Sequence, residues 1–399
     1  MGLAHTMVPD NVPSERVVDF DVYNPTPDAE RYHQAFVDFQ RTTPHPLVWT
    51  HHHGGHWIAV RGQDVFDLYA DHEHFSSRHF FVPAAPDQVP MGAFTLDPPQ
   101  HQPFRTFLNH GFAFKTVSGK TPLVQQLAAD LAGGLVERGS CEFITEFADV
   151  LPLTVFLDLV ELPLTDREHL GALADAATRD PDPAHRVQAI NGIAAYLQPH
   201  LAARKGKPGE DLLSRAVNAD IGGRPITDAE ALGACIHILG AGLDTVSSLF
   251  SFVMLFLARH PEHRRALVDH PELIPTAAME LIRRFPVVTM ARQVRMDMDY
   301  LGVRLRAGQM VALPSALYNL DETIYERPMD VDWNRKVGKV LTFGNGPHRC
   351  PGQVLGRNEL VIGLQEWLQR IPDFSVPVDA RVPVIGGTVA KILELPLVW

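Results

Sequence analysis

A glycine-rich loop around a cysteine is the first feature whose residue types suit chemistry. The loop reads FGNGPHRCPG at residues 343–352, and a helical pattern follows from Gly352 to Arg370. Because Cys350 stands just before a predicted helix, free backbone N–H groups and the helix dipole would stabilise its thiolate. Glycines let the chain turn tightly and approach a flat partner closely. A lone cysteine is usually a small buried residue, so the case for a reactive thiolate depends on the surrounding glycines.

A second candidate lies inside the longest apolar helical pattern, about residues 228–258. At 1.5 Å per residue this helix would be about 45 Å long and would cross the middle of a large core. The segment GAGLDT at 240–245 interrupts the pattern. Each glycine costs up to about 1 kcal/mol in a helix interior, and a buried aspartate costs more unless it is paired or hydrated. Such departures often mark a site, so Asp244 and Thr245 are candidate catalytic residues.

The elements that would position these segments are mostly helical. We expect an irregular arm at about 1–45, a β-hairpin at 47–61, helices from about 63 to 261, and β alternation at 300–313. Thr227 and Glu230 match a capping box at the start of the central helix. Residues 314–349 show little regular pattern, and such long loops are usually functional. No repeat divides the chain, so we predict a single mainly α domain with small β-sheets over residues 1–399.

Composition and charge exclude several classes of protein. The 399 residues are 45% hydrophobic and 21% charged, which argues against a disordered chain, and the formal net charge of −12 argues against general nucleic-acid binding. Three cysteines, Cys141, Cys235 and Cys350, lie far apart, which argues against a disulfide framework and a cysteine-rich zinc site. The N-terminus lacks a signal-peptide pattern, and the apolar run 246–258 is too short to span a bilayer. We therefore expect a soluble, cytoplasmic protein.

In these segments the chain resembles the cytochrome P-450 family of haem-thiolate monooxygenases. The loop 343–352 matches its FxxGxxxCxG pattern, AGLDT at 241–245 its oxygen-activating helix, and ELIR at 280–283 its ExxR helix. The three together, in order and suitably spaced, are very specific. The resemblance covers essentially the whole chain and is nearest to the bacterial camphor-hydroxylase type. It implies the triangular single-domain haem-thiolate fold with a long central helix, and a haem b (iron protoporphyrin IX) cofactor.

The resemblance also assigns roles around the haem. Cys350 would be the thiolate ligand of the iron. Other residues expected at the cofactor are Ala241, Phe343 and Gly352. The haem propionates need cations or hydrogen-bond donors, and the expected set is His101, Arg105, Arg292 and His348. Met290 replaces an aspartate expected beside Arg292, so one propionate would be held differently.

By the same resemblance, Thr245 and Asp244 deliver the protons that the cleavage of dioxygen requires. The alternative for Thr245 is a hydrogen bond from its hydroxyl back to a helix carbonyl. Glu280 and Arg283 are expected to brace the long loop. Their third partner would be Arg327 or Arg335.

Four histidines near the hairpin turn offer a competing site. His51, His52, His53 and His56 have no matching carboxylate or cysteine spacing, so we favour solvated hairpin residues over a metal site.

The substrate is less determined by the sequence. No tyrosine occurs between Tyr69 and Tyr196, although camphor hydroxylases use one there to hold their ketone. Residues that align with pocket positions are Phe81, Val89, Val288, Thr388 and Val389. His237 stands where an apolar residue is expected, and it either hydrogen-bonds a substrate oxygen or is a core histidine. We hypothesise hydroxylation of a terpenoid or an ionone-like norisoprenoid.

Electrons are expected from a [2Fe–2S] ferredoxin and its NAD(P)H-dependent reductase, by analogy with the subgroup. A local basic patch for docking would contain Arg105, Lys336, Lys339, Arg349 and Arg357. The competing readings are a peroxide-driven peroxygenase and a non-enzymatic haem sensor. The intact Asp–Thr pair argues against both.

Overall fold

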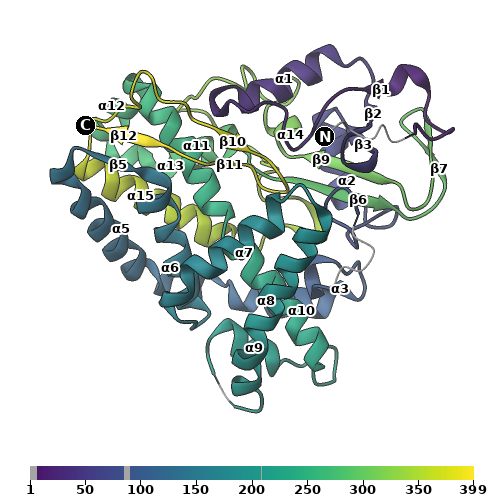
Figure 1. The fold of residues 1–399 in the computed structure, drawn as a ribbon, viewed down its shortest axis with the longest axis horizontal. Helices are drawn as coiled ribbons and strands as arrows, with labels where there is room; N and C mark the ends of the chain where they lie inside the picture. Colours follow the sequence, from purple (N-terminus) through teal and green to yellow (C-terminus); the bar gives the residue numbers. More distant parts are fainter. Residues whose placement is uncertain (1–6, 85–89, 208) are drawn as a thin grey trace.

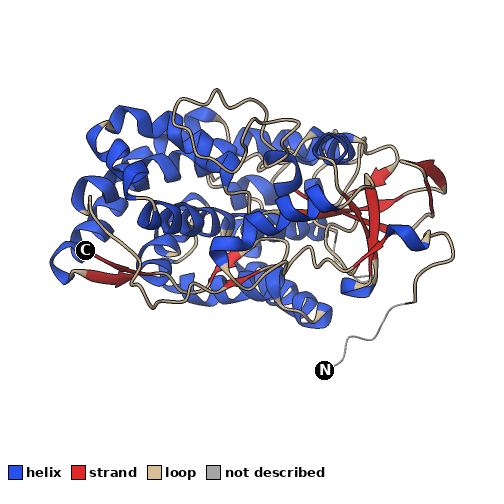
Figure 2. Cartoon of the chain, turned by 90° about the horizontal axis from the view of Figure 1, so that it is seen from above, coloured by secondary structure: helices blue, strands red, loops and turns tan. Residues whose placement is uncertain are grey.

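A computed structural model of the chain describes residues 7–84, 90–207 and 209–399. Helices fill most of the molecule, and the main sheet lies in one corner, on the right in Figure 1. The outline in that view is roughly triangular. From above, the main sheet again occupies one end and helices the other (Figure 2). The predicted mainly α fold with small sheets is therefore confirmed.

The main sheet has six strands in the order β1-β2-β3-β9-β6-β4. The strands are β1 (Val17–Val18), β2 (Leu47–Thr50), β3 (His56–Ala59), β9 (Met310–Pro314), β6 (Thr289–Val294) and β4 (Phe75–Ser76). The predicted hairpin is β2 and β3, which run antiparallel with Trp49 opposite Trp57. β9 comes from late in the chain and pairs in parallel with β3. This pairing joins the N-terminal hairpin to the segment that follows the ExxR helix.

Three two-stranded sheets complete the β structure. They are β7 (Met298–Tyr300) with β8 (Val303–Leu305), β5 (Ser140–Glu142) with β12 (Pro396–Val398), and β10 (Val384–Ile385) with β11 (Lys391–Ile392). The predicted β alternation at 300–313 is therefore divided, because β8 and β9 belong to different sheets. β6 was not expected from the sequence, since TMARQV lacks a clear alternation of apolar and polar residues.

The helices surround the central pair α10 and α11. The first group is α1 (Tyr32–Thr42), α2 (Gly62–Ala70), α3 (His101–Gly111), α4 (Phe114–Gly119), α5 (Thr121–Leu135), α6 (Val150–Leu159), α7 (Arg167–Arg179), α8 (Pro183–Arg204) and α9 (Leu212–Val217). The second group is α10 (Asp228–Gly242), α11 (Thr245–Arg259), α12 (Pro261–Asp269), α13 (Ile274–Arg284), α14 (Ala316–Asn319) and α15 (Gln353–Arg370). α15 packs against α5, α11 and α13, while α10 packs against α8 and α9.

The central helix begins and breaks where the sequence predicts. Thr227 and Glu230 form the capping box: the Thr227 side chain accepts from the Glu230 N–H, and the Glu230 carboxylate accepts from the Thr227 N–H. The helix is divided at Leu243 and Asp244, so α10 and α11 are separate segments. Together they are long and apolar enough to span a membrane, with a mean hydropathy of 1.7 over the most apolar window. Because 72% of that window is buried in the fold, the length and apolarity fit a core helix.

The long irregular stretch 314–349 is mostly loop, as expected. It contains one short helix, α14, and a single 3-10 turn at Gly346–His348. The predicted last helix is α15, which begins one residue after Gly352 and ends at Arg370 as expected.

The histidines near the hairpin turn are not the solvated residues that the sequence suggested. His56 is buried, and burial lowers its pKa to about 3. Nε2 of His52 lies 2.7 Å from Oδ1 of Asp19, and Nε2 of His53 lies 2.7 Å from Oδ1 of Asp21. The arm that precedes α1 supplies these carboxylates, which a reading of the hairpin alone could not include. Within the described residues, no His, Cys, Asp and Glu side chains form a metal-binding group.

Candidate active site

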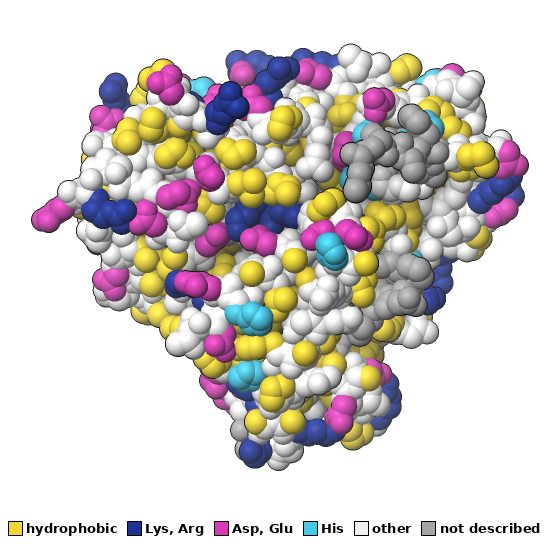
Figure 3. Space-filling view, viewed as in Figure 1, with side chains coloured by type: hydrophobic (Ala, Val, Ile, Leu, Met, Phe, Trp, Pro, Cys, Tyr) yellow, Lys and Arg dark blue, Asp and Glu magenta, His cyan; other side chains and the backbone are white. Residues whose placement is uncertain are grey.

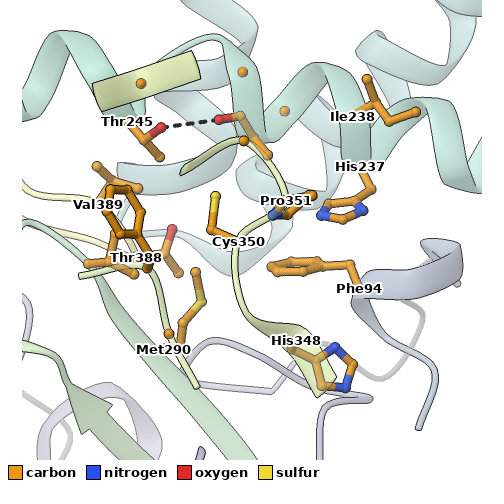
Figure 4. Close-up of a pocket in the computed structure, with 18 of the residues that line it drawn as sticks. Phe94, His237, Ile238, Thr245, Met290, His348, Cys350, Pro351, Thr388 and Val389 are labelled. Carbon is orange, nitrogen blue, oxygen red and sulfur yellow. Dashed lines mark hydrogen bonds between the residues drawn. The ribbon is translucent and has the colours of Figure 1, made fainter. Parts of the chain in front are cut away.

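A cavity of about 290 Å³ lies between the central helix and the loop that precedes α15. Most of its lining side chains are apolar. Figure 4 shows Cys350 in this cavity, with the rings of Phe94 and His237 together on one side and with Thr388 and Val389 on the other. The two candidate segments, far apart in the sequence, therefore meet at one cavity.

Cys350 is positioned by the backbone of its loop. Its N–H donates to the carbonyl of Phe343 at 2.7 Å, which closes the loop just before α15. Burial raises the pKa of the Cys350 thiol, while the backbone N–H groups of Gly352 and Gln353 and the charge of Arg105 act to lower it. Because burial outweighs these groups, the chain alone favours the thiol, and metal coordination would supply the deprotonation.

Three glycines in the two candidate segments are explained by different local surroundings. Gly346 has φ +68°, and a Cβ there would lie 2.6 Å from the Cα of Ala70, so only glycine fits. A Cβ on Gly242 would lie 2.2 Å from the ring of Phe156 on α6. Gly240 lines the cavity, and a Cβ there would meet nothing within 4 Å. Gly242 therefore admits a neighbouring aromatic ring, while Gly240 leaves open space.

Asp244 is buried and paired, as an aspartate in the middle of an apolar helix requires. Its side chain is 3% exposed and forms an ion pair with Arg179, which ends α7. Arg179 also donates to Ser248 Oγ at 3.2 Å and pairs with Asp175. Lys391 extends the network, with its Nζ 3.4 Å from Oδ1 of Asp175. Arg179 was not predicted from the sequence, because a buried carboxylate requires a cation but the sequence does not specify which one.

Thr245 is the first residue of α11 and lines the cavity. Its Oγ1 donates to the carbonyl of Ala241 at 3.3 Å, drawn as a dashed line in Figure 4. The back-bonding alternative is therefore the arrangement observed. Because the hydroxyl still faces the cavity, the same oxygen can accept a hydrogen bond there.

Known proteins similar to this chain identify its family. The family model described as cytochrome P-450 matches residues 193–384. A probable cytochrome P-450, 127A1 of Sinorhizobium fredii, is 32% identical over 98% of this chain and 97% of its own length. The solved structure of CYP101J2 is 40% identical, with a TM-score of 0.90, and the match covers 99% of this chain and 99% of that one. The solved structure of CYP101C1 is also 40% identical, with a TM-score of 0.89, and the match covers 98% of this chain and 100% of that one. The chain belongs to the cytochrome P-450 family.

This P-450 is a monooxygenase whose cofactor is haem b, as the family and the similar structures imply. Such an enzyme acts on an organic substrate with dioxygen and receives electrons from a redox partner. The predictions of the family, fold, enzyme class and cofactor are therefore confirmed.

The residues expected at the haem propionates have unused hydrogen-bonding capacity. Both ring nitrogens of His101 and Nε2 of His348 are buried without a partner among the described residues. The two rings lie 4.6 Å apart, and His348 Nδ1 donates to the carbonyl of Ala93 at 3.1 Å. Arg292 is 4% exposed, and the only hydrogen bond that its side chain makes within the described part of the chain goes to the carbonyl of its neighbour Ala291.

Arg105 is half-buried and lines the cavity with Arg292. A buried cluster of cations and unpaired donors is costly unless it meets an anion. These residues therefore fit the carboxylates of a haem, and Phe343, Ala241 and Gly352 also line the cavity as expected.

The Glu280–Arg283 pair of the ExxR helix is fully buried, with the two side chains 1% and 0% exposed. Arg283 donates two hydrogen bonds to Glu280, at 2.7 and 2.8 Å, and others to the carbonyls of Asn319 and Pro328. Arg335 completes the network, since its Nε donates to Glu280 Oε1 at 2.9 Å. Of the two arginines left open by the sequence, Arg335 is the partner, and Arg327 instead lies near Asp330 at the surface.

The expected substrate residues are only partly brought together. His237, Val288, Thr388 and Val389 line the cavity. Phe81 is not among its lining residues, because the adjacent Phe80 faces the cavity while the guanidinium of Arg186 lies 4.7 Å above the Phe81 ring. Adjacent residues point in opposite directions here, and the sequence alone does not specify which of the two phenylalanines faces the cavity. Val89 lies outside the described residues.

Proposed function

We propose that this P-450 inserts one oxygen atom from dioxygen into an unactivated C–H bond of a small apolar substrate. One observation carries the proposal: the thiol of Cys350 and the hydroxyl of Thr245 line the same apolar cavity. Haem, when bound through Cys350, supplies the activation of dioxygen. The residues of the chain hold that cofactor, enclose the substrate and supply protons.

Proton delivery is assigned to Asp244 and Thr245. The Asp244 carboxylate is held by Arg179 at the break of the central helix, one residue before the hydroxyl that faces the cavity. Positioned acids and bases of this kind contribute about 10²- to 10⁴-fold to rate. Arg179 acts through Asp244 and is therefore a positioning residue.

For the substrate, we propose a terpenoid or an ionone-like norisoprenoid. The apolar lining of the cavity suits a hydrocarbon skeleton. The absence of tyrosine between Tyr69 and Tyr196 supports a ligand other than camphor. The proposed contacts are Phe80, Val288, Thr388 and Val389, with Val89 as a further candidate.

A [2Fe–2S] ferredoxin, reduced by an NAD(P)H-dependent reductase, is the proposed electron donor. Four cations that flank Cys350 in the sequence have exposed side chains: Lys336, Lys339, Arg349 and Arg357. They would attract an acidic partner although the protein is acidic overall. On the face in Figure 3, basic and acidic side chains are interspersed. We place the enzyme in the cytoplasm, consistent with three free cysteines.

The first test is the reduced carbon monoxide difference spectrum of the wild type and of Cys350→Ser. We expect the thiolate-type band in the wild type only. An unchanged band in the serine variant would remove the proposed ligand.

The second test is oxygen consumption and product formation with a ferredoxin system, comparing Asp244→Asn with Asp269→Asn, whose side chain is exposed on α12. Asp244→Asn should slow product formation about 10²-fold or more, and Asp269→Asn should not. Equal product formation from peroxide alone would support a peroxygenase instead. No oxygen consumption would support a haem sensor.

A further inference from the structure

We propose that His237 is a specificity-determining residue that hydrogen-bonds one oxygen atom of the substrate, and that this oxygen lies at the end of the molecule remote from the carbon that reacts. The inference rests on the proposed function, because it takes the cavity beside Cys350 as the substrate site.

The first observation is an unused polar atom. Nδ1 of His237 is buried and has no hydrogen-bond partner among the described residues. Nε2 also has no hydrogen-bond partner among the described residues, and it is the ring nitrogen that keeps accessible surface where His237 lines the cavity. Polar atoms inside a protein are almost always paired, so Nε2 calls for a partner from outside the chain. The other polar side chains of that cavity include Thr178 and Thr388, whose hydroxyls already donate to the carbonyls of Ala174 and Thr178. His237 is therefore a side chain in the cavity wall with capacity to spare.

The second observation is that the imidazole ring is held in place. It stacks on Phe94, with ring centroids 4.5 Å apart and an interplanar angle of 14°. Phe94 in turn contacts Phe80, with centroids 4.4 Å apart. Figure 4 shows the stacked rings on one side of the cavity, across from Thr388. A ring fixed in this way can orient a ligand without first losing rotational freedom.

Charge state supports the same role. Burial, followed by the nearby charges of Arg105 and His101, lowers the pKa of His237 to about 3. The ring is therefore neutral at pH 7, with one nitrogen that donates and one that accepts. It can bind a ketone as a donor or an alcohol as an acceptor, and no charge is buried in the process.

The distance between His237 and Thr245 along the helix indicates that the bound oxygen is remote from the carbon that reacts. The eight residues from His237 to Thr245 correspond to about 12 Å along a helix. Gly240 lies between them, and a Cβ there would meet nothing within 4 Å, which leaves room for the body of a ligand. The oxygen held by His237 and the carbon near Thr245 must then lie at opposite ends of a small molecule.

The test compares ligands that differ only in one oxygen. Fenchone with fenchane, and menthone with p-menthane, are titrated against the haem-loaded wild type, His237→Leu, His237→Gln and the control Cys235→Ala. Cys235 is buried on the same helix but does not line the cavity. The spin-state change on binding gives each Kd and does not depend on turnover.

We expect His237→Leu to weaken ketone binding about 3- to 10-fold, the effect of one hydrogen bond, and to leave hydrocarbon binding unchanged or tighter. His237→Gln should restore part of the preference, and Cys235→Ala should retain all of it. The preference should not change between pH 6 and 8, because the ring stays neutral.

Two results would overturn the proposal. The first is equal weakening of ketone and hydrocarbon, accompanied by faster transfer of haem to apomyoglobin, which would make His237 a haem-holding residue. The second is unchanged binding of both ligands. In either case an intact carbon monoxide spectrum would leave the proposed monooxygenase function standing, so the two failures can be distinguished.

Discussion

Replacing Arg179 by alanine removes the cation that holds the buried Asp244 carboxylate. The two side chains are 5% and 3% exposed, so the carboxylate left behind stays out of contact with bulk water. In the variant, the hydrogen bond left to Asp244 comes from Ser248, whose Oγ lies 3.4 Å from Asp244 Oδ1. One long hydrogen bond does not offset the desolvation of a carboxylate.

The expected loss of stability follows from this burial. Removing one partner of a buried ion pair costs about 3–5 kcal/mol. The second ion pair of Arg179, with the half-exposed Asp175, contributes at most about 1 kcal/mol. Lys391 lies 3.1 Å from Asp149 and remains to offset part of the negative charge. We therefore expect Arg179→Ala to lose about 3 kcal/mol.

The assay is a double-mutant cycle on the haem-loaded enzyme. Arg179→Ala, Asp244→Asn and the double variant are unfolded with denaturant and followed by far-ultraviolet circular dichroism. The double variant should be more stable than the sum of the single losses predicts, by about 2 kcal/mol, because it buries no unpaired charge. Arg265→Ala, at an exposed position on α12, is the matched control and should change stability by less than about 0.5 kcal/mol. Losses that add within about 0.5 kcal/mol would refute the ion pair as the reason that Asp244 is tolerated.

Two further predictions concern residues that line the cavity. Gly242→Ala should lower the free energy of unfolding by about 1–3 kcal/mol, because the added Cβ would meet the Phe156 ring at 2.2 Å. Gly240→Ala, where the added Cβ meets nothing within 4 Å, should be neutral or stabilising by up to about 1 kcal/mol. Equal effects of the two substitutions in thermal unfolding would contradict this prediction. Burial raises the pKa of Glu359 to about 8, well above the ordinary value of a glutamate. Between these two pH values the folded state keeps a proton that the unfolded chain loses, so stability from this group falls as pH rises through that window. Glu359→Gln should remove a decline of up to about 2–3 kcal/mol between pH 6 and 8, and a wild-type stability that follows the variant across this range would show that Glu359 does not titrate there.

Local patterns in the sequence predicted the parts of the site that depend on neighbours in the chain. The capping box at Thr227 and Glu230 and the hairpin at 47–61 were found because backbone geometry links residues a few positions apart. The loop before Cys350 was also predicted from residues that are close together in the chain. The solvated histidines were a wrong prediction, since His56 is covered by packing that no pattern within the hairpin records.

By itself, then, the sequence determined the glycine-rich loop before Cys350, the interrupted central helix, the mainly α fold and the family to which the chain belongs. Only the tertiary structure decided that Arg179 meets Asp244, that Arg335 rather than Arg327 meets Glu280, and that Phe80 rather than Phe81 lines the cavity. The physical reason is the range of the interactions. Caps, turns and helical periods involve residues within a few positions, while ion pairs between side chains 55 or 65 residues apart exist only when helices pack in one particular arrangement.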